Sequence, residues 1–232
     1  MSAVCILALE TATDACSAAL SIDGEIRERF EIAPRRHVAL VLPFVESLLA
    51  DAGLGVARLD AVAFGRGPGS FTGLRIAASM AQGIAFGADI PVVPVSTLAA
   101  VAQCCVRECN AGAVLAALDA RMQEVYFGAF RVAHNGLVVA AGVESVCAPD
   151  SVAVPAGADW YGAGDGWSSY ADLLQARLSG ATVGTMAGAR PHAADVAALA
   201  IPLLQAGGGL PAEQAAPGYL RNKVADKPGA KV

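Results

Sequence analysis

Glycines and hydroxyl groups gather in the stretch 65–75, GRGPGSFTGLR, which follows an apolar run and precedes a helical pattern. A glycine-rich turn at the start of a helix is typical of phosphate-binding loops. A Walker A loop also needs a lysine that reaches the outer phosphates, and this stretch has none. Ser70 can instead cap the helix, and Gly73 lets its first turn approach neighbouring backbone closely. The stretch therefore predicts a helix start, with an anion site there as the alternative.

Histidines and cysteines could support metal or nucleophilic chemistry only at suitable spacings. Two histidines at i and i+4 can share a metal ion on one helix face, but the residue four after His37 is Val41. The six cysteines include no CxxC pair, and the sequence has no HExxH motif. We therefore expect no metal site.

The first residues and the cysteines together indicate a compartment. MSAVCILALE lacks a basic leader, and its apolar run is too short for a secretory core or a membrane span. We interpret the cysteines as reduced thiols. A cytoplasmic protein without a membrane segment is expected.

The charge of the chain limits which partners it can bind. The net charge is -5, and all three lysines, at 223, 227 and 231, lie in the last ten residues. Binding to nucleic acid normally needs a basic stripe, because neutralising phosphates supplies most of the affinity. The protein alone is expected to hold RNA poorly. The tail with Arg221 and these lysines could touch phosphate or simply be solvated.

Hydrophobic periodicity predicts the elements of the first half. The run 4–9 is typical of a buried strand closed by Glu10, and the runs 16–22 and 25–32 alternate around the Asp23-Gly24 turn. The pattern continues with a helix over 34–50, a strand over 60–65, a helix over 70–86, a strand over 91–95 and a helix capped by Ser96. This order predicts a meander extended into a mixed sheet with crossover helices.

The second half repeats this order. It predicts strands over 113–119, 124–130 and 137–146 with an Asn135-Gly136 turn, then a strand over 159–161, a glycine turn over 162–166, a helix over 168–178, a strand over 181–183 and a helix over 191–205. The repeat predicts two similar α/β lobes, 1–108 and 109–210, and a tail over 211–232. Glu10 and Asp119 fall at equivalent strand ends. This is the layout of the duplicated actin-like ATPase fold, shared by sugar kinases, Hsp70 and actin, with a mixed sheet and flanking helices in each lobe.

Four segments spread from residue 6 to 225 closely resemble the bacterial TsaB family, also called YeaZ: ILALETATDACSAAL, GRGPGSFTGLRIAASMAQGIAFGADIPVVPVSTLAA, LDARMQEVYFGAF and GYLRNKVA. The resemblance implies a role in making N6-threonylcarbamoyladenosine in tRNA. It also implies two partners, a TsaD-type transferase that carries the metal and the transfer chemistry and a TsaE-type ATPase. The chain would be a non-catalytic subunit without a cofactor of its own, ATP would be used by the partner complex, and tRNA would be reached only through that complex.

The loops of the expected cleft are poor in phosphate-binding features. TATDACS, over 11–17, offers hydroxyls and Asp14 but no glycine and no basic residue. Arg121 could contact a phosphate, and the turn 162–166 keeps glycine character. The candidates for a vestigial cleft are Glu10, Thr11, Asp119, Arg121 and Gly164. Little intrinsic ATP hydrolysis is expected.

The helix over 70–86 carries many small side chains, which allow close helix packing. Together with the helix over 34–50, which is apolar on much of its circumference, it could form a docking surface for two partner helices or for a second copy of the chain. Both helices could instead simply cover the sheet. The predicted interface residues are His37, Leu40, Val41, Phe44, Thr72, Ile76, Ser79, Met80 and Gly83. An active ATPase or kinase, or a glycoprotease-type peptidase, remain the alternative functions.

Overall fold

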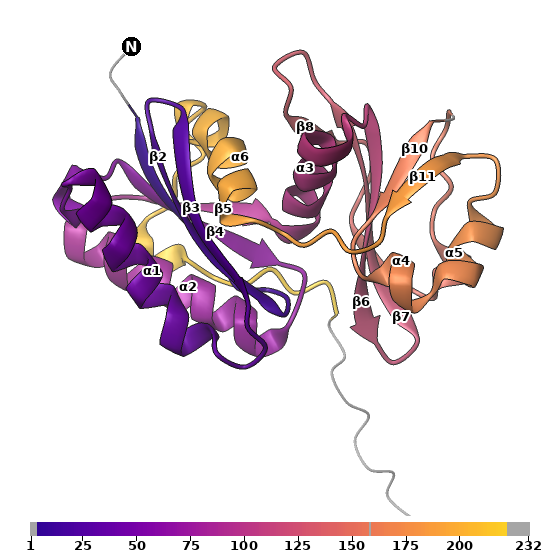
Figure 1. Cartoon of the computed structure of the whole chain (residues 1–232), viewed down its shortest axis with the longest axis horizontal. Helices are drawn as coiled ribbons and strands as arrows, with labels where there is room; N and C mark the ends of the chain where they lie inside the picture. The colour runs from indigo at the N-terminus through magenta and orange to yellow at the C-terminus, as the bar shows by residue number, and fades with distance from the viewer. Residues whose placement is uncertain (1–3, 158, 222–232) are drawn as a thin grey trace, which may run out of the picture.

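Two β-sheets with the same strand order form the framework (Figure 1). The computed structural model describes residues 4–157 and 159–221. The first sheet has the order β3-β2-β1-β4-β5 and contains β1 (Cys5–Glu10), β2 (Ala15–Ile22), β3 (Glu25–Ile32), β4 (Ala61–Gly67) and β5 (Val92–Ser96). The second has the equivalent order β8-β7-β6-β10-β11 and contains β6 (Ala113–Arg121), β7 (Glu124–Val132), β8 (Val138–Ala140), β10 (Trp160–Ala163) and β11 (Thr182–Met186), with β9 (Ser145–Cys147) also paired to β7. In each sheet an antiparallel meander continues into two parallel strands. The predicted duplicated fold is confirmed.

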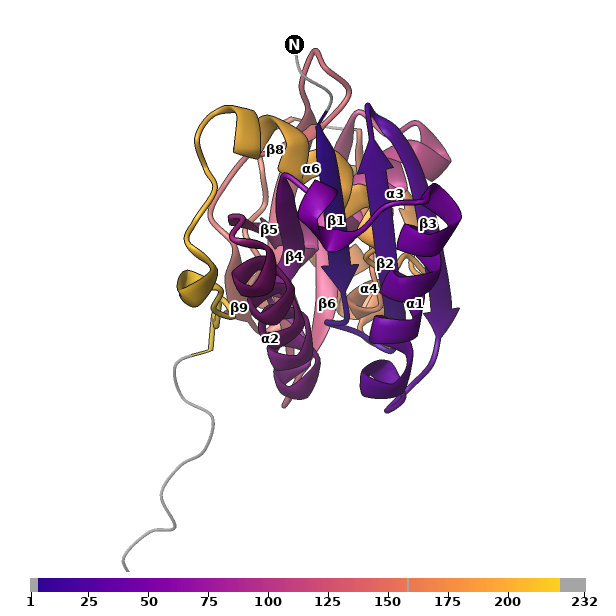
Figure 2. The same ribbon diagram turned by 90° about the vertical axis from the view of Figure 1, so that its left-hand side faces the viewer.

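Helices cover both sheets on both faces. α1 (His37–Ala52) and α2 (Phe71–Ala88) pack on the outer face of the first sheet, as Figure 2 shows. α4 (Gly166–Ser169) and α5 (Ala171–Arg177) pack on the outer face of the second sheet. α3 (Thr97–Cys109) and α6 (Ala193–Gln205) lie between the two sheets. Three short turns of 3-10 helix complete the element order: η1 (Val56–Arg58), η2 (Pro149–Ser151) and η3 (Ala212–Gln214).

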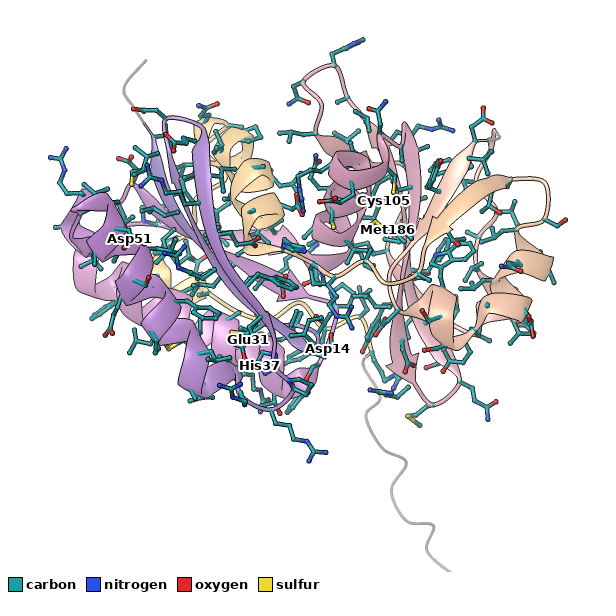
Figure 3. The ribbon with its side chains drawn as sticks, in the orientation of Figure 1. Asp14, Glu31, His37, Asp51, Cys105 and Met186 are labelled. Atoms are coloured by element: carbon teal, nitrogen blue, oxygen red, sulfur yellow. The ribbon has the colours of Figure 1, made fainter. Side chains whose placement is uncertain are left out.

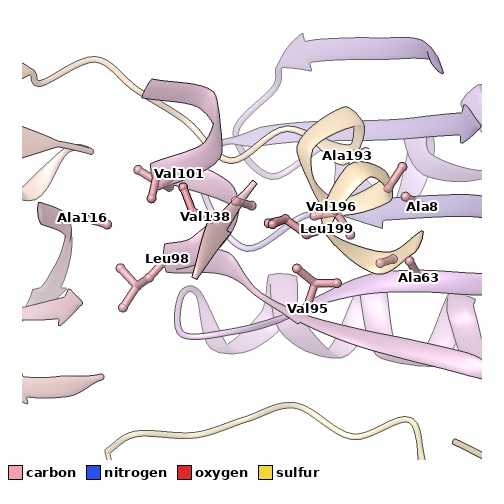
Figure 4. Packing of buried hydrophobic residues seen from close by; sticks show 14 of the residues in the cluster. Ala8, Ala63, Val95, Leu98, Val101, Ala116, Val138, Ala193, Val196 and Leu199 are labelled. Atoms are coloured by element: carbon pink, nitrogen blue, oxygen red, sulfur yellow. The ribbon is translucent and has the colours of Figure 1, made fainter. Parts of the chain in front are cut away.

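The helices between the sheets are exchanged between the two halves of the sequence. α3 packs chiefly against β6 and β7 of the second sheet, whereas α6 packs against β1, β2, β4 and β5 of the first. Their apolar side chains, among them Leu98, Val101, Val196 and Leu199, meet alanines of both sheets in one core (Figure 4). Each half of the sequence therefore contributes its last helix to the sheet of the other half.

Two elements of the second half differ from their predictions. The strand expected over 137–146 is two strands, β8 and β9, which pair with opposite ends of β7. Between them Glu144 leaves the sheet and accepts a hydrogen bond from Ser96. The helix expected over 168–178 is broken at Tyr170, whose backbone is not helical and whose hydroxyl donates to Asp119 at 3.2 Å. Long-range contacts override the local pattern in both places.

The two predicted helix caps are confirmed. Ser70 accepts a hydrogen bond from the backbone N–H of Gly73, and Ser96 accepts one from Ala99. Both hydroxyls satisfy amides that a helix start leaves without intrahelical partners. α1 begins at His37 instead of near residue 34, because Arg35 has a left-handed backbone with φ of 66°.

Candidate functional site

A cavity of about 880 Å³ opens where the two lobes meet. Its walls come from the β1–β2 loop, the stretch 68–74, the β6–β7 turn and the C-terminal segment 218–221. The expected cleft falls at this position, and Figure 3 shows Asp14 at the boundary of the lobes. Of the predicted cleft residues, Asp119 and Arg121 line the cavity. Glu10, Thr11 and Gly164 do not.

Glu10 is buried behind the cavity wall with 1% of its surface exposed. Its carboxylate accepts hydrogen bonds from the Ala12 amide at 2.6 Å and the Thr97 hydroxyl at 3.2 Å. Burial raises the pKa of Glu10 to about 7, and these hydrogen bonds limit the rise. Since it contacts the start of α3 and the β1–β2 loop, Glu10 holds elements together and faces no open cleft.

Asp119 is held by groups of its own lobe. Its carboxylate accepts from the backbone N–H and the guanidinium of Arg121, both at 2.8 Å. The Asp119 amide in turn donates to Asp165 at 2.9 Å. Arg121, the residue that the sequence offered for a phosphate, is therefore already paired with a carboxylate.

The remaining charges at the cavity are of both signs. Asp14 accepts two hydrogen bonds from Arg190 at 2.7 and 2.9 Å, and the hydrogen bonding holds the pKa of Asp14 below its usual range. Burial raises the pKa of Asp165. Three carboxyl groups, those of Asp14, Asp119 and Asp165, line the cavity together with three arginines, Arg35, Arg121 and Arg221, and the Ala12 amide is used by Glu10. Asp14 and Asp119 are each paired with an arginine, so an anion here would have to compete with carboxylates already in place.

The glycine-rich stretch 65–75 forms a helix start, as the sequence predicted. A Cβ atom on Gly69 would lie 2.6 Å from the Ala12 carbonyl oxygen, and one on Gly73 would lie 2.0 Å from that of Thr11. The Ser70 amide also donates to the Ala12 oxygen at 2.7 Å. The glycines therefore seat the start of α2 directly on the β1–β2 loop.

The outer face of α1 and α2 presents apolar side chains to solvent. Val38 and Phe86 are 73% and 75% exposed, and Leu42 and Phe71 are exposed as well. Leu40, Phe44, Ile76 and Met80 are half-buried against the core of the first lobe, whereas Thr72, Ser79 and Gly83 are exposed. Figure 2 views this face with both helices in front of the sheet. Exposed apolar side chains thus lie on two neighbouring helices, and we call this side of the two helices the α1/α2 face.

Two predicted interface residues lie elsewhere. Val41 is fully buried against the sheet, and the His37 ring is buried, with Nε2 at 3.0 Å from the Thr13 oxygen and 3.1 Å from the Ala15 oxygen. His37 fastens the start of α1 to the first lobe, in the position labelled in Figure 3. The exposed residues Val38, Leu42, Phe71 and Phe86 are not among the predicted interface residues, because a helix that is apolar on most sides does not indicate which side the sheet covers.

Three further observations concern the part of the chain that is described. No group of three or more His, Cys, Asp or Glu side chains within residues 4–157 and 159–221 is arranged to hold a metal ion. All six cysteines fall in these ranges and are free. None of the helices found there is long and apolar enough to cross a membrane. The three lysines of the tail lie outside the described residues.

The duplicated sheets, exchanged helices and inter-lobe cavity define a two-lobed protein of the actin-like class. A family model described as TsaD, tRNA N6-adenosine threonylcarbamoyltransferase, matches residues 30–227. The chain is 40% identical over 225 residues to the tRNA threonylcarbamoyladenosine biosynthesis protein TsaB of Escherichia coli, covering 96% of both chains. It is also 40% identical to the TsaB protein of Haemophilus influenzae, with 97% of this chain and 96% of that one covered.

A solved structure, YeaZ from Pseudomonas aeruginosa, matches with a TM-score of 0.88 and 46% identity over 94% of this chain and all of that one. The chain therefore belongs to the TsaB (YeaZ) family, within the wider family that the TsaD model describes.

Proposed function

We propose that the protein is a non-catalytic subunit of the machinery that makes threonylcarbamoyladenosine in tRNA, and that it docks a TsaD-type transferase through the α1/α2 face. The observation that carries the proposal is this apolar face, which exposes Val38 and Phe86 on two adjacent helices. Apolar surface shared by neighbouring helices is typical of protein–protein contacts. The names of the TsaB relatives support the pathway.

The chemistry of the cleft supports a non-catalytic role. Asp119 and Arg121 pair with each other, and Glu10 is buried in a structural network. A nucleotide phosphate would have to compete with the Asp119 carboxylate for Arg121. We therefore assign ATP use to the complex and to its TsaE-type ATPase, and we assign the metal and the transfer step to the transferase.

The charge of the chain supports binding of tRNA through a partner. The net charge is -5, and the lysines are confined to the last ten residues. Because affinity for RNA comes largely from neutralising phosphates, this protein would meet tRNA in the cytoplasm mainly through its partner.

The α2 helix provides a sharp test of docking. Gly83 is exposed, and a Cβ atom there would meet nothing within 4 Å, so Gly83→Arg can fold without a clash. In the interface its charge would lose water without gaining a partner, so association with the transferase should weaken by roughly a hundredfold or more. Met80→Glu should act in the same direction.

Gly112→Arg is the matched control, because Gly112 is exposed in the second lobe and also has open space around it. Association measured by calorimetry and threonylcarbamoylation of tRNA in a reconstituted assay give the two readouts, after thermal unfolding has shown that each variant is folded. Equal association of the Gly83→Arg and Gly112→Arg variants would refute docking through this face. The α1/α2 face could also pair two copies in the free protein, and the same variants would then be monomeric in sedimentation.

A further inference from the structure

The C-terminal segment 218–221 crosses from the first lobe to the second. The chain reaches it from the edge of the first sheet, where Leu210 exchanges two backbone hydrogen bonds of 2.9 Å with Val92, and through η3, which packs against α2. Gly218 then donates to the Arg66 oxygen at 2.6 Å. Three residues later, Arg221 contacts the second lobe.

At its first-lobe end the segment is bound to the start of α2. The Tyr219 ring stacks on Phe71 with centroids 5.6 Å apart, and the Tyr219 hydroxyl accepts a hydrogen bond from Arg75 at 3.1 Å. The Arg75 guanidinium lies 3.7 Å from the centre of the Phe71 ring. Stacking, a cation–π contact and a hydrogen bond thus join three side chains at one place.

At its second-lobe end the segment is bound to the β6–β7 turn. Arg221 donates to the Glu124 carboxylate and, at 3.3 Å, to the Met122 sulfur. The guanidinium side chain is 17% exposed, so this ion pair is partly shielded from solvent. The turn itself has three consecutive residues in the left-handed region, Arg121, Met122 and Gln123, with φ of 61°, 55° and 62°. None is glycine, so the turn is strained and needs outside contacts to persist.

We propose that residues 218–221 are a latch that couples the start of α2 to the β6–β7 turn across the cavity. All four residues line the cavity, so the latch is also one of its walls. It joins the helix of the α1/α2 face to the loop that carries Asp119 and Arg121. A closed latch keeps the first turn of α2 in the conformation that the transferase binds, and this last step rests on the proposed docking function.

Two truncations separate the latch from the rest of the tail. A chain ending at Arg221 keeps every latch contact, whereas a chain ending at Pro217 loses them all. In the isolated chain that ends at Arg221, amide hydrogen exchange over 121–125 should be the same as in the full chain. In the chain that ends at Pro217, exchange over 121–125 and 71–75 should be at least about threefold faster. Equal exchange in the two chains would overturn the latch.

Charge reversal tests coupling through the ion pair between Arg221 and Glu124. Arg221→Glu and Glu124→Arg should each speed amide hydrogen exchange over 71–75, in the other lobe. The double variant should recover much of the protection, because the ion pair is restored with its charges reversed. Arg36→Ala, which removes the surface pair with Glu31, serves as the control and should leave both segments unchanged. Single variants that affect 121–125 alone would refute coupling across the cavity.

Binding to the transferase tests the proposed effect of the latch on docking. The chain ending at Pro217 should bind the transferase at least about threefold more weakly than the chain ending at Arg221. Faster exchange with unchanged binding would overturn the link to docking. Because exchange is measured without a partner, failure of the docking proposal in the Gly83→Arg experiment would leave the latch test valid.

Discussion

The Gly73 carbonyl oxygen accepts a hydrogen bond of 2.7 Å from the Thr11 hydroxyl, while a Cβ atom on Gly73 would lie only 2.0 Å from the Thr11 carbonyl oxygen. The start of α2 therefore lies so close to the β1–β2 loop that no side chain fits at position 73. This contact places α2, and with it half of the α1/α2 face, relative to the first sheet.

Gly73→Ala should lower the free energy of unfolding by roughly 2 kcal/mol or more, because backbone must move to admit the methyl group. Gly83→Ala is the control in the same helix, where a Cβ atom meets nothing. Higher helix propensity should raise its stability by up to about 1 kcal/mol. Urea unfolding measures both values. Similar effects at the two positions would contradict the close approach at Gly73.

Glu10 should make stability fall as the pH rises. Its pKa is raised from 4.5 to about 7 in the folded protein, so between these values the folded state holds a proton that the unfolded state has released. The free energy of unfolding therefore declines between about pH 4.5 and pH 7 and then levels off. The total decline is about 3 kcal/mol, because each pKa unit corresponds to about 1.4 kcal/mol.

Glu10→Gln imitates the protonated carboxyl and should remove this decline. Unfolding free energies at pH 5 and pH 8 should differ less in the variant than in the parent protein. An Asp119→Asn variant, at the other equivalent strand end, serves as the control. If the parent and the Glu10→Gln variant show the same pH dependence, Glu10 is not the group responsible.

The ion pair between Arg107 of α3 and Asp195 of α6 joins the two exchanged helices, with both hydrogen bonds at 3.1 Å. Its partners differ in burial, since the side chain of Asp195 is 4% exposed and that of Arg107 is 43% exposed. Arg107→Ala should cost roughly 2–4 kcal/mol, because it leaves a buried carboxylate without its partner. Asp195→Asn leaves an arginine that can turn to water and should cost about half as much. The opposite order in denaturant unfolding would contradict this account.

ATP should bind the isolated protein with a dissociation constant weaker than about 1 mM, since two arginines of the cavity are already paired, Arg121 with Asp119 and Arg221 with Glu124. Asp119→Ala frees Arg121 and removes a negative charge, so it should leave weak binding unchanged or strengthen it. Calorimetry and a phosphate-release assay decide the matter. Micromolar binding with turnover that Asp119→Ala abolishes would restore the ATPase alternative.

Much of the fold could be predicted from the sequence, because its signals are local. The Asp23-Gly24 turn has both residues at positive φ, Ser70 and Ser96 cap the predicted helices, and the two halves repeat one order of strands. A cap or a tight turn depends on residues within a few positions of one another. Such features are fixed wherever the segment lies in the fold.

The site required the tertiary structure. Alternating strands predict neither that α3 and α6 exchange sheets nor that Glu10 lies behind the cavity wall, because both depend on which surfaces meet. The apolar pattern of α1 could not decide between Val38, which is exposed, and Val41, which is buried. The contact of Arg221 with Glu124 joins residues 97 positions apart. The sequence shows which side chains are apolar or charged. Only the packing of distant segments determines whether such a side chain is buried, ion-paired or exposed.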